Sequence, residues 1–235
     1  MILAALPAGL DPPVTSEADE TEWVWDIYLY LAIGVAAFVA LLVLYVIVRF
    51  RRRDGDGLPS QKQYNVPVEL AYTIIPLLII AALFAITVIT VEAIEEIDDD
   101  PDLVVQVTAA QWQWQFDYPD SGVSVTGAGE EFPELVLPAS SSVTFELQSL
   151  DVIHSFWITA FRFKRDMIPG SPGRFSVDIE DVAGYYPNAG VCAEYCGLAH
   201  GKMRFEVRIL EPDEFDAWIA EQQAAGQTGE GESST

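Results

Sequence analysis

The sequence predicts a membrane-anchored all-β protein, in which a two-helix transmembrane hairpin precedes an external β-sandwich of Greek-key order. Two long apolar segments without charges lie in the first half of the 235 residues. Basic residues gather in the loop between them. The second half contains short segments rich in β-branched and aromatic residues, divided by Pro, Gly, Ser and Asp, as strands and turns are.

The two apolar segments, 27–48 and 70–91, each hold 22 uncharged residues. With a rise of about 1.5 Å per residue, each helix reaches about 33 Å, enough to cross a hydrocarbon core of about 30 Å. Buried helices of soluble proteins seldom stay uncharged over this length, so we expect both to span a membrane. Pro76 should bend the second helix without interrupting it.

The loop between the spans, 49–69, carries five basic residues against three acidic ones. Short loops rich in Lys and Arg stay in the cytoplasm. Both ends of the chain are therefore expected outside, as an external segment 1–26 and an external domain 92–211. The apolar opening MILAALPAGL has no preceding basic residue, which disfavours a cleavable signal and leaves its processing open.

The chain is strongly acidic, with a net charge of −24 and only three lysines. Residues 92–235 alone hold 27 acidic residues against 7 basic ones. A basic partner would explain this charge, and so would a salt-rich habitat. The acids are spread through every segment, which favours the halophilic interpretation. At about 1 M salt the Debye length is about 3 Å, so docking would rest on short-range apolar contacts.

The external domain is predicted to contain about seven strands, a number typical of a Greek-key sandwich. The segments are LVVQVTAAQWQWQFDY, VSVTG, ELVLP, SVTFELQS, HSFWITAF, RFSVDI and MRFEVRIL. Residues 212–235 should consist of a short helix and a tail. The helix should run from Asp213 to Ala224 and is preceded by Pro212. The acidic tail GQTGEGESST that follows is expected to be disordered.

The segment GVCAEYCGLAHGKM, residues 190–203, holds both cysteines, one of the two histidines and one of the three methionines. Cys192, Cys196 and His200 are spaced by four, as on one face of a helix, and Met203 follows. Loop-forming residues argue against a helix; they are Pro187, Asn188, Gly190, Gly197 and Gly201. A loop that folds these side chains around one point is the better interpretation.

Three kinds of site could use such a segment. A disulfide suits an external domain, but it explains neither His200 and Met203 nor the other histidine, His154, which begins a predicted strand. A zinc site uses two Cys and two His, yet zinc-finger spacing is absent. Thiolate, imidazole and thioether together are typical of copper in electron transfer. A mononuclear blue-copper site needs one cysteine, whereas a second thiolate could bridge two copper ions.

The run from Cys192 to Met203 matches the pattern C-x-E-x-C-G-x-x-H-x-x-M of the binuclear copper A centre. Over residues 23–211 the chain resembles subunit II of haem-copper cytochrome c oxidases. This resemblance implies a cupredoxin-like sandwich that binds two copper ions. The implied ligands are the bridging thiolates of Cys192 and Cys196, one imidazole per copper from His154 and His200, the weak thioether of Met203 and the backbone carbonyl of Glu194.

The resemblance implies roles for further residues. Trp112 in QWQWQF is similar to the tryptophan that receives electrons in this family, whereas Trp114 fits an ordinary strand aromatic. Glu69 matches the acid at the mouth of a proton path, although a carboxylate also stabilises a helix start. The Glu194 side chain resembles a ligand for Mg²⁺ shared with subunit I. Arg204 departs from the family, which usually has proline after the methionine ligand.

Both histidines are thereby assigned to copper, so this chain cannot reduce dioxygen itself. The implied function is to accept electrons from cytochrome c or a small blue copper protein and pass them to haem in subunit I. The other expected partners are subunit III and the lipid bilayer of a prokaryotic cell membrane. Nucleic acid is not expected among the partners. A quinol oxidase subunit would lack the copper ligands, and a nitrous oxide reductase would need a large further domain. A membrane-tethered copper carrier or assembly factor stays as the alternative.

Overall fold

A computed structural model of the chain describes residues 12–51, 57, 60–128 and 132–231. The described residues fall into two compact units. Residues 22–92 form one unit, and residues 93–235 together with the segment before residue 22 form the other. The two units differ in sequence pattern, because the first contains two long uncharged apolar runs and the second alternates apolar with polar residues.

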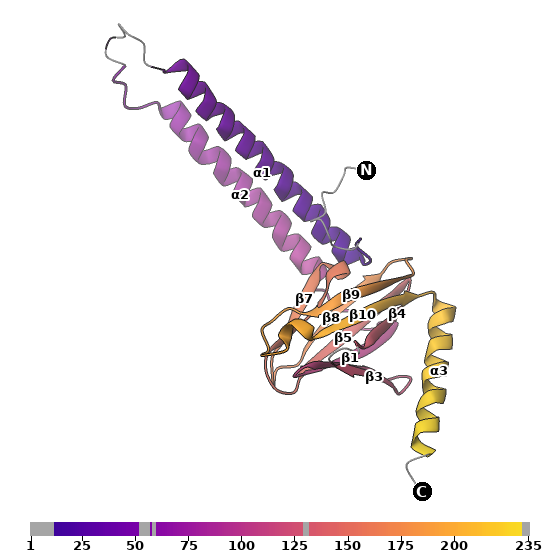
Figure 1. The fold of residues 1–235 in the computed structure, drawn as a ribbon. Helices are drawn as coiled ribbons and strands as arrows, with labels where there is room; N and C mark the ends of the chain where they lie inside the picture. The colour runs from indigo at the N-terminus through magenta and orange to yellow at the C-terminus, as the bar shows by residue number, and fades with distance from the viewer. Residues whose placement is uncertain (1–11, 52–56, 58–59, 129–131, 232–235) are drawn as a thin grey trace. The chain divides into compact units, whose positions relative to one another are not determined.

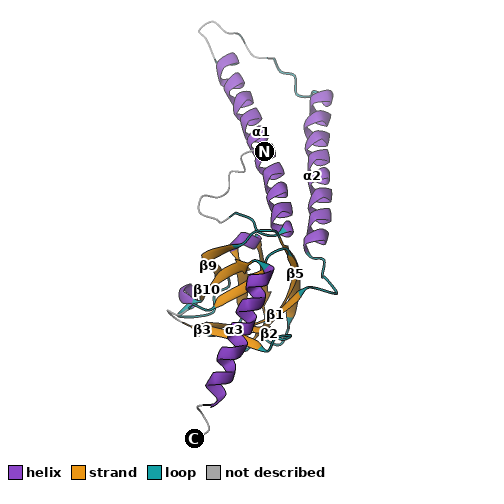
Figure 2. Cartoon of the chain, turned by 90° about the vertical axis from the view of Figure 1, so that its right-hand side faces the viewer, coloured by secondary structure: helices purple, strands orange, loops and turns teal. Residues whose placement is uncertain are grey.

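The first unit consists of two helices that run side by side, α1 (Ser16–Arg49) and α2 (Val66–Ile94) (Figures 1 and 2). The hydroxyl of Tyr28 forms a 2.8 Å hydrogen bond with that of Thr87, which joins the two helices. Their large apolar side chains are exposed, including Val48 (66%) and Phe84 (69%). Soluble proteins rarely leave such a surface to water, so these helices suit lipid. The two predicted spans are confirmed as helices, and α2 continues through Pro76.

The second unit is a sandwich of two five-stranded sheets. The strands of the first sheet, in spatial order, are β3 (Val123–Ala128), β2 (Gln113–Tyr118), β1 (Leu103–Ala110), β5 (Ser141–Ser149) and β8 (Gly173–Ile179). Those of the second are β4 (Glu134–Pro138), β10 (Arg204–Leu210), β9 (Gly184–Cys192), β6 (His154–Ile158) and β7 (Phe163–Met167). The predicted fold, a hairpin of helices followed by a β-sandwich, is confirmed.

The structure has more strands than the seven predicted. The segment LVVQVTAAQWQWQFDY is two strands, because the chain turns at Gln111 and Trp112 between β1 and β2. Strands β7 and β9 were not predicted. Strand β9 contains Pro187, Asn188 and Gly190, which indicated a loop, but it accommodates them in an irregularity where its register with β10 shifts. The positive φ of Asn188, 59°, belongs to this irregularity.

Aromatic side chains fill the space between the sheets. The ring of Phe156 stacks on that of Phe205 with centroids 5.0 Å apart, and Trp114 meets both rings edge-on. These three side chains are at most 1% exposed. They belong to β6, β10 and β2, so they join the two sheets at the end of the sandwich that carries His154. The three rings thus form a rigid aromatic base next to His154.

Helix α1 begins eleven residues before the predicted span, at Ser16. The Ala18 N–H donates to the hydroxyl of Thr15, a side-chain cap that starts the helix. Thr15 is fully buried and bridges Ile179 of β8. The start was missed because acidic residues fill the helix between Ser16 and the apolar run. The predicted separate segment 1–26 is thus partly helix, and residues 1–11 lie outside the described residues.

Helix α3 (Pro212–Gly231) packs against β3, β4 and β10, and its Phe215, which is 8% exposed, lies beside the ring of Tyr118 of β2. The prediction ended this helix at Ala224, with a disordered tail after it. In the structure the backbone is helical up to Gly231, beyond the predicted end at Ala224. Residues 232–235 lie outside the described residues.

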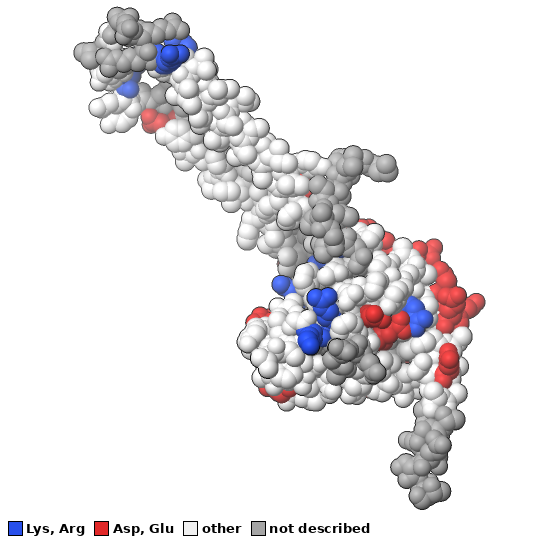
Figure 3. All heavy atoms as spheres, viewed as in Figure 1, with Lys and Arg blue, Asp and Glu red and all other residues white. Residues whose placement is uncertain are grey.

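Acidic side chains are spread over the visible face of the sandwich unit, with basic ones between them (Figure 3). Burial and the neighbouring Asp19 carboxyl raise the pKa of Glu180, so some acids repel one another when ionised. We predict that this unit is stable only in concentrated salt, because low salt leaves such repulsion unscreened. The midpoint of thermal unfolding of the full chain, followed by near-ultraviolet circular dichroism, should rise from dilute to multimolar KCl. Equal midpoints would contradict the halophilic interpretation.

Candidate metal centre

Strand pairing brings His154 and Cys192 together. In the antiparallel pair β6–β9, Phe156 lies opposite Cys192, and His154 precedes Phe156 by two residues on the same face. The His154 side chain is fully buried, and its Nδ1 lies 3.8 Å from the Cys192 Sγ. The position of His154 at the start of a strand agrees with the sequence prediction.

The remaining donors come from the loop 193–203, which joins β9 to β10. Its base is closed by the Cys192 N–H, which donates to the Met203 carbonyl at 3.0 Å. The loop contains only a single short 3₁₀ turn, His200–Lys202, so the loop interpretation is confirmed over the helical one. This path places the His200 Nδ1 3.6 Å and the Met203 Sδ 3.8 Å from the Cys196 Sγ.

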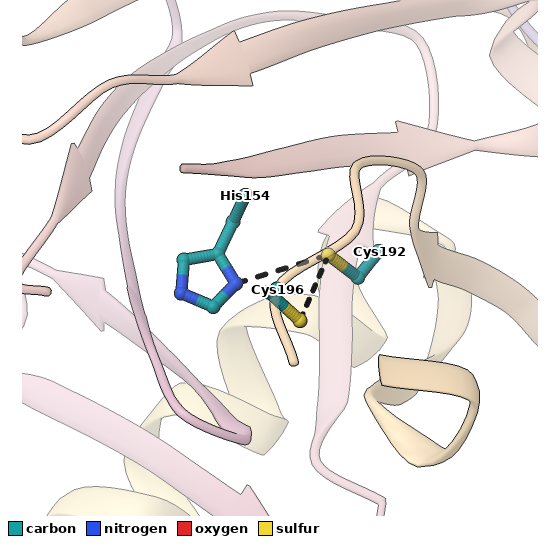
Figure 4. A group of neighbouring side chains, drawn as sticks. All are labelled: His154, Cys192 and Cys196. Carbon is teal, nitrogen blue, oxygen red and sulfur yellow. Dashed lines mark hydrogen bonds between the residues drawn. The ribbon is translucent and has the colours of Figure 1, made fainter. Parts of the chain in front are cut away.

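The two thiols face each other without a bond. Their Sγ atoms are 3.8 Å apart and both cysteines are free (Figure 4). A disulfide needs a sulfur–sulfur distance of about 2.04 Å. The disulfide considered from the sequence is therefore not the state of this structure. The backbone carbonyl of Glu194 also points at the pair and lies 3.2 Å from the Cys192 Sγ.

The spacing of these donors suits metal coordination. Ligand atoms about 2.0–2.3 Å from a tetrahedral ion lie about 3.3–3.8 Å from one another. The contacts of the two sulfurs with nitrogen, oxygen and sulfur donors span 3.2–3.8 Å. Each sulfur has its own imidazole, His154 at Cys192 and His200 at Cys196. The six residues therefore fit a soft metal ion and offer two sulfurs that could be shared between two ions.

Burial and neighbouring groups give the two thiols different proton affinities. Burial raises the pKa of Cys192, but contacts with His154 and with the backbone of Ser155 and Glu194 outweigh it and lower the pKa to about 6. Burial and the charge of Cys192 raise the pKa of Cys196 to about 12. The Cys192 thiolate thus forms readily near neutral pH, and its negative charge disfavours ionisation of the Cys196 thiol. A metal ion that binds both must displace the remaining proton.

Asp151 holds the imidazole of His154 from the side away from the sulfurs. The Nε2 of His154 lies 2.9 Å from an Asp151 carboxylate oxygen. Burial alone would lower the pKa of His154, but contacts with Cys192 and Asp151 outweigh burial and raise this pKa. Burial alone would raise the pKa of Asp151, but its hydrogen bonds with His154, Gln111 and Val152 outweigh burial and lower this pKa. With a proton on Nε2 shared with the carboxylate, Nδ1 is free to bind a metal.

The two tryptophans of QWQWQF have different surroundings. The Trp112 side chain is partly exposed, and its indole N–H donates to the Cys196 carbonyl at 3.2 Å. Trp114 is fully buried, and its ring lies 6.4 Å from that of His154. The burial of Trp114 on β2 fits the ordinary strand aromatic expected from the sequence, and the electron-transfer role of Trp112 stays a prediction. Sequence reasoning missed Asp151 and Gln111, because no spacing pattern marks them and their role depends on contacts between distant segments.

Three further features were singled out from the sequence, namely Glu69, the side chain of Glu194 and Arg204. Glu69 belongs to the helical unit, and its carboxylate accepts the Asn65 N–H at 2.9 Å, an arrangement that stabilises the start of α2. The Glu194 side chain is exposed and accepts the Tyr195 N–H. Arg204 is exposed and begins β10, and the preceding Met203 is 1% exposed.

Comparisons with known proteins agree with this geometry. The family model for the periplasmic domain of cytochrome c oxidase subunit II matches residues 130–210, and the model for its transmembrane domain matches residues 5–91. A probable cytochrome c oxidase subunit 2 of Nocardia farcinica is 31% identical over 95% of this chain and 75% of its own length. The chain belongs to the cytochrome c oxidase subunit II family. The cytochrome c oxidase subunit 2 of Mycobacterium bovis is also 31% identical, over 95% of this chain and 77% of its own.

Among solved structures, the periplasmic domain of subunit II of the Bradyrhizobium japonicum oxidase is 28% identical. It covers 54% of this chain and 96% of its own, with a TM-score of 0.48. As a member of the subunit II family, the chain is a membrane protein with a periplasmic domain and a subunit of an oxidoreductase complex. Its function is that of the electron-accepting subunit of a terminal cytochrome c oxidase.

Proposed function

We propose that the periplasmic domain binds a binuclear copper A centre through six residues. The thiolates of Cys192 and Cys196 and the imidazoles of His154 and His200 would hold the two copper ions, and the Met203 thioether and the Glu194 carbonyl would add weaker ligands. The observation that carries the proposal is the pair of unbonded sulfurs 3.8 Å apart, each beside its own imidazole Nδ1. When bound, such a copper pair supplies a one-electron carrier whose charge is shared through the thiolates.

The residues of this chain contribute rigidity and exclusion of water. His154, Cys192, Cys196 and Met203 are at most 7% exposed, so water has little access to the donors. The rigid aromatic base and the carboxylate of Asp151 hold the imidazole of His154 in one orientation. A fixed ligand arrangement that changes little between oxidation states needs little reorganisation, and this favours fast electron transfer.

We further propose Trp112 as the residue through which an external carrier delivers electrons, with cytochrome c or a small blue copper protein as the carrier. Its hydrogen bond to the Cys196 carbonyl links the partly exposed indole directly to a ligand residue. The next acceptor is haem in subunit I, with subunit III in the same complex. The same proposal assigns the Glu194 side chain to a shared Mg²⁺ and Glu69 to a proton path.

The proposed orientation places both termini and the copper domain on the outer side of a prokaryotic cell membrane. The loop 49–69 then lies in the cytoplasm, because its basic residues outnumber its acidic ones. A cysteine introduced at Ser60, in that loop, should react with a membrane-permeant maleimide but stay protected from an impermeant one in intact cells. Labelling of that cysteine by the impermeant reagent would refute this orientation.

Copper counting on the full chain in detergent tests the metal assignment. After loading with copper, we expect two ions per chain and a purple thiolate-to-copper absorption. Binding of one colourless Cu(I) ion would instead support the alternative of a copper carrier. Binding of zinc in preference to copper would contradict the proposal.

Replacing Trp112 with phenylalanine tests the electron path. The variant loses the hydrogen bond to the Cys196 carbonyl, and reduction of the copper centre by the carrier should slow by about 10- to 100-fold. Stopped-flow absorption in the assembled oxidase measures this rate. The matched control is Trp157→Phe, since Trp157 contacts Lys164 and lies on the face of β6 opposite to His154 and Phe156. Equal rates in the two variants would show that electrons do not pass through Trp112.

A further inference from the structure

Gln111 lies in the turn between β1 and β2 and forms hydrogen bonds with both segments that carry the metal-binding residues. Its backbone N–H donates to an Asp151 carboxylate oxygen at 2.7 Å. Its side-chain Nε2 donates to the Cys196 carbonyl at 2.7 Å. Asp151 belongs to the segment that leads into β6, and Cys196 to the loop between β9 and β10. Gln111 therefore connects two segments that are 45 residues apart in the chain.

Both partners of Gln111 are themselves bound to functional groups. The Asp151 carboxylate also contacts the Nε2 of His154, and the Cys196 carbonyl also accepts the indole N–H of Trp112. A continuous series of hydrogen bonds thus runs from His154 through Asp151 and Gln111 to Cys196 and Trp112. It consists of protein groups alone, so it orders the site before any metal binds.

The glycine that follows Cys196 makes the close approach of the loop possible. Gly197 has a φ of +118°, which L residues with side chains rarely adopt. A Cβ at Gly197 would lie 3.0 Å from the Gln111 Nε2 and 3.2 Å from the Trp112 ring. The cysteine loop is therefore packed directly on residues 111 and 112, and a side chain at position 197 would force them apart.

We infer that Gln111 is a positioning residue that holds the histidine segment and the cysteine loop at a fixed separation. This inference rests on the proposed function of the site as a copper centre. Fixing the two segments keeps His154 and Cys196 in place when the charge of the site changes, and it keeps Trp112 in contact with the ligand loop. Without the side-chain bond of Gln111, the cysteine loop can open locally while the sandwich stays folded.

The decisive variant is Gln111→Glu, whose carboxylate cannot donate to the Cys196 carbonyl. The matched control is Gln113→Glu, which makes the same chemical change two residues away. Gln113 is exposed on β2, and no hydrogen bond among the described residues joins its side chain to either segment. Gln111→Met is a second variant that removes the donor without adding charge, in case the new carboxylate disturbs folding.

Hydrogen–deuterium exchange of the copper-free full chain gives a readout that does not depend on the metal. In the peptide that covers 193–203, the amides of His200 and Lys202 donate within the loop and should be protected. Loss of one hydrogen bond should make local opening, and hence exchange, about five-fold faster in both Gln111 variants. Gln113→Glu should exchange like the unaltered chain.

Copper release gives the second readout. After loading, transfer of copper from the chain to a Cu(I) chelator should be about ten-fold faster in the Gln111 variants than in Gln113→Glu. Equal exchange and equal release in the Gln111 and Gln113 variants would overturn the inference. If the unaltered chain binds no copper pair, the proposed function fails instead, and the exchange experiment alone still decides whether Gln111 holds the loop.

Discussion

Replacing Cys196 with serine should reduce the copper content of the full chain from two ions to one or none and abolish the purple absorption. A serine hydroxyl is a poor ligand for copper, and it cannot replace the thiolate as a bridge between two ions. The loss should be large because the Cys196 Sγ contacts Cys192, His200 and Met203 at once. Electron transfer from the carrier should then stop.

The matched control for this variant is Leu198→Ser, two residues along the same loop. Leu198 is 95% exposed and has no metal-binding group, so its replacement also introduces a hydroxyl but should leave copper binding intact. Metal analysis and the visible spectrum distinguish the two variants. Two copper ions and an unchanged spectrum in Cys196→Ser would refute a bridging role for this cysteine, and with it the binuclear centre.

Strong local patterns allowed the fold to be predicted from the sequence, whereas the ligand set was implied by the family resemblance of residues 192–203 and stays a prediction. The uncharged runs 27–48 and 70–91 identify the helices because only a membrane tolerates such surfaces. The four donor side chains of residues 192–203 lie so close in sequence that almost any loop brings them together. His154 was harder to place, since its contact with Cys192 depends on the pairing of β6 with β9.

Contacts between distant segments could not be predicted in this way. Strand β9 was missed because Pro and Gly are read as breakers, whereas an irregular strand accommodates them when its neighbours supply the pairing. Asp151 and Gln111 are ordinary polar residues in turns, and only the folded chain shows that they join His154 to Cys196. Helix α1 began earlier than predicted for a similar reason, since its first turn is fixed by contacts of Thr15 with the sandwich.

Gly190→Ala should strongly destabilise the periplasmic domain. A Cβ at Gly190 would lie 2.1–2.3 Å from three atoms of the Phe205 ring, far inside van der Waals contact. Phe205 cannot move away freely, because it is fully buried, stacks on Phe156 and meets Trp114 edge-on. Overpacking of this kind costs about 3 kcal/mol, which lowers an unfolding midpoint by about 6–12 °C in a domain of this size.

The control for this substitution is Gly201→Ala, because a Cβ at Gly201 has no atom within 4 Å. Thermal unfolding of the full chain in detergent should show a lower midpoint for Gly190→Ala and an unchanged one for Gly201→Ala. The double variant Gly190→Ala with Phe205→Leu should recover part of the loss, since the smaller side chain makes room for the methyl group. Because the Trp114 ring also lies beside the ring of His154, Gly190→Ala should weaken copper binding as well. A midpoint that Gly190→Ala leaves unchanged would mean that the aromatic layer yields easily and cannot be the rigid base of the metal centre.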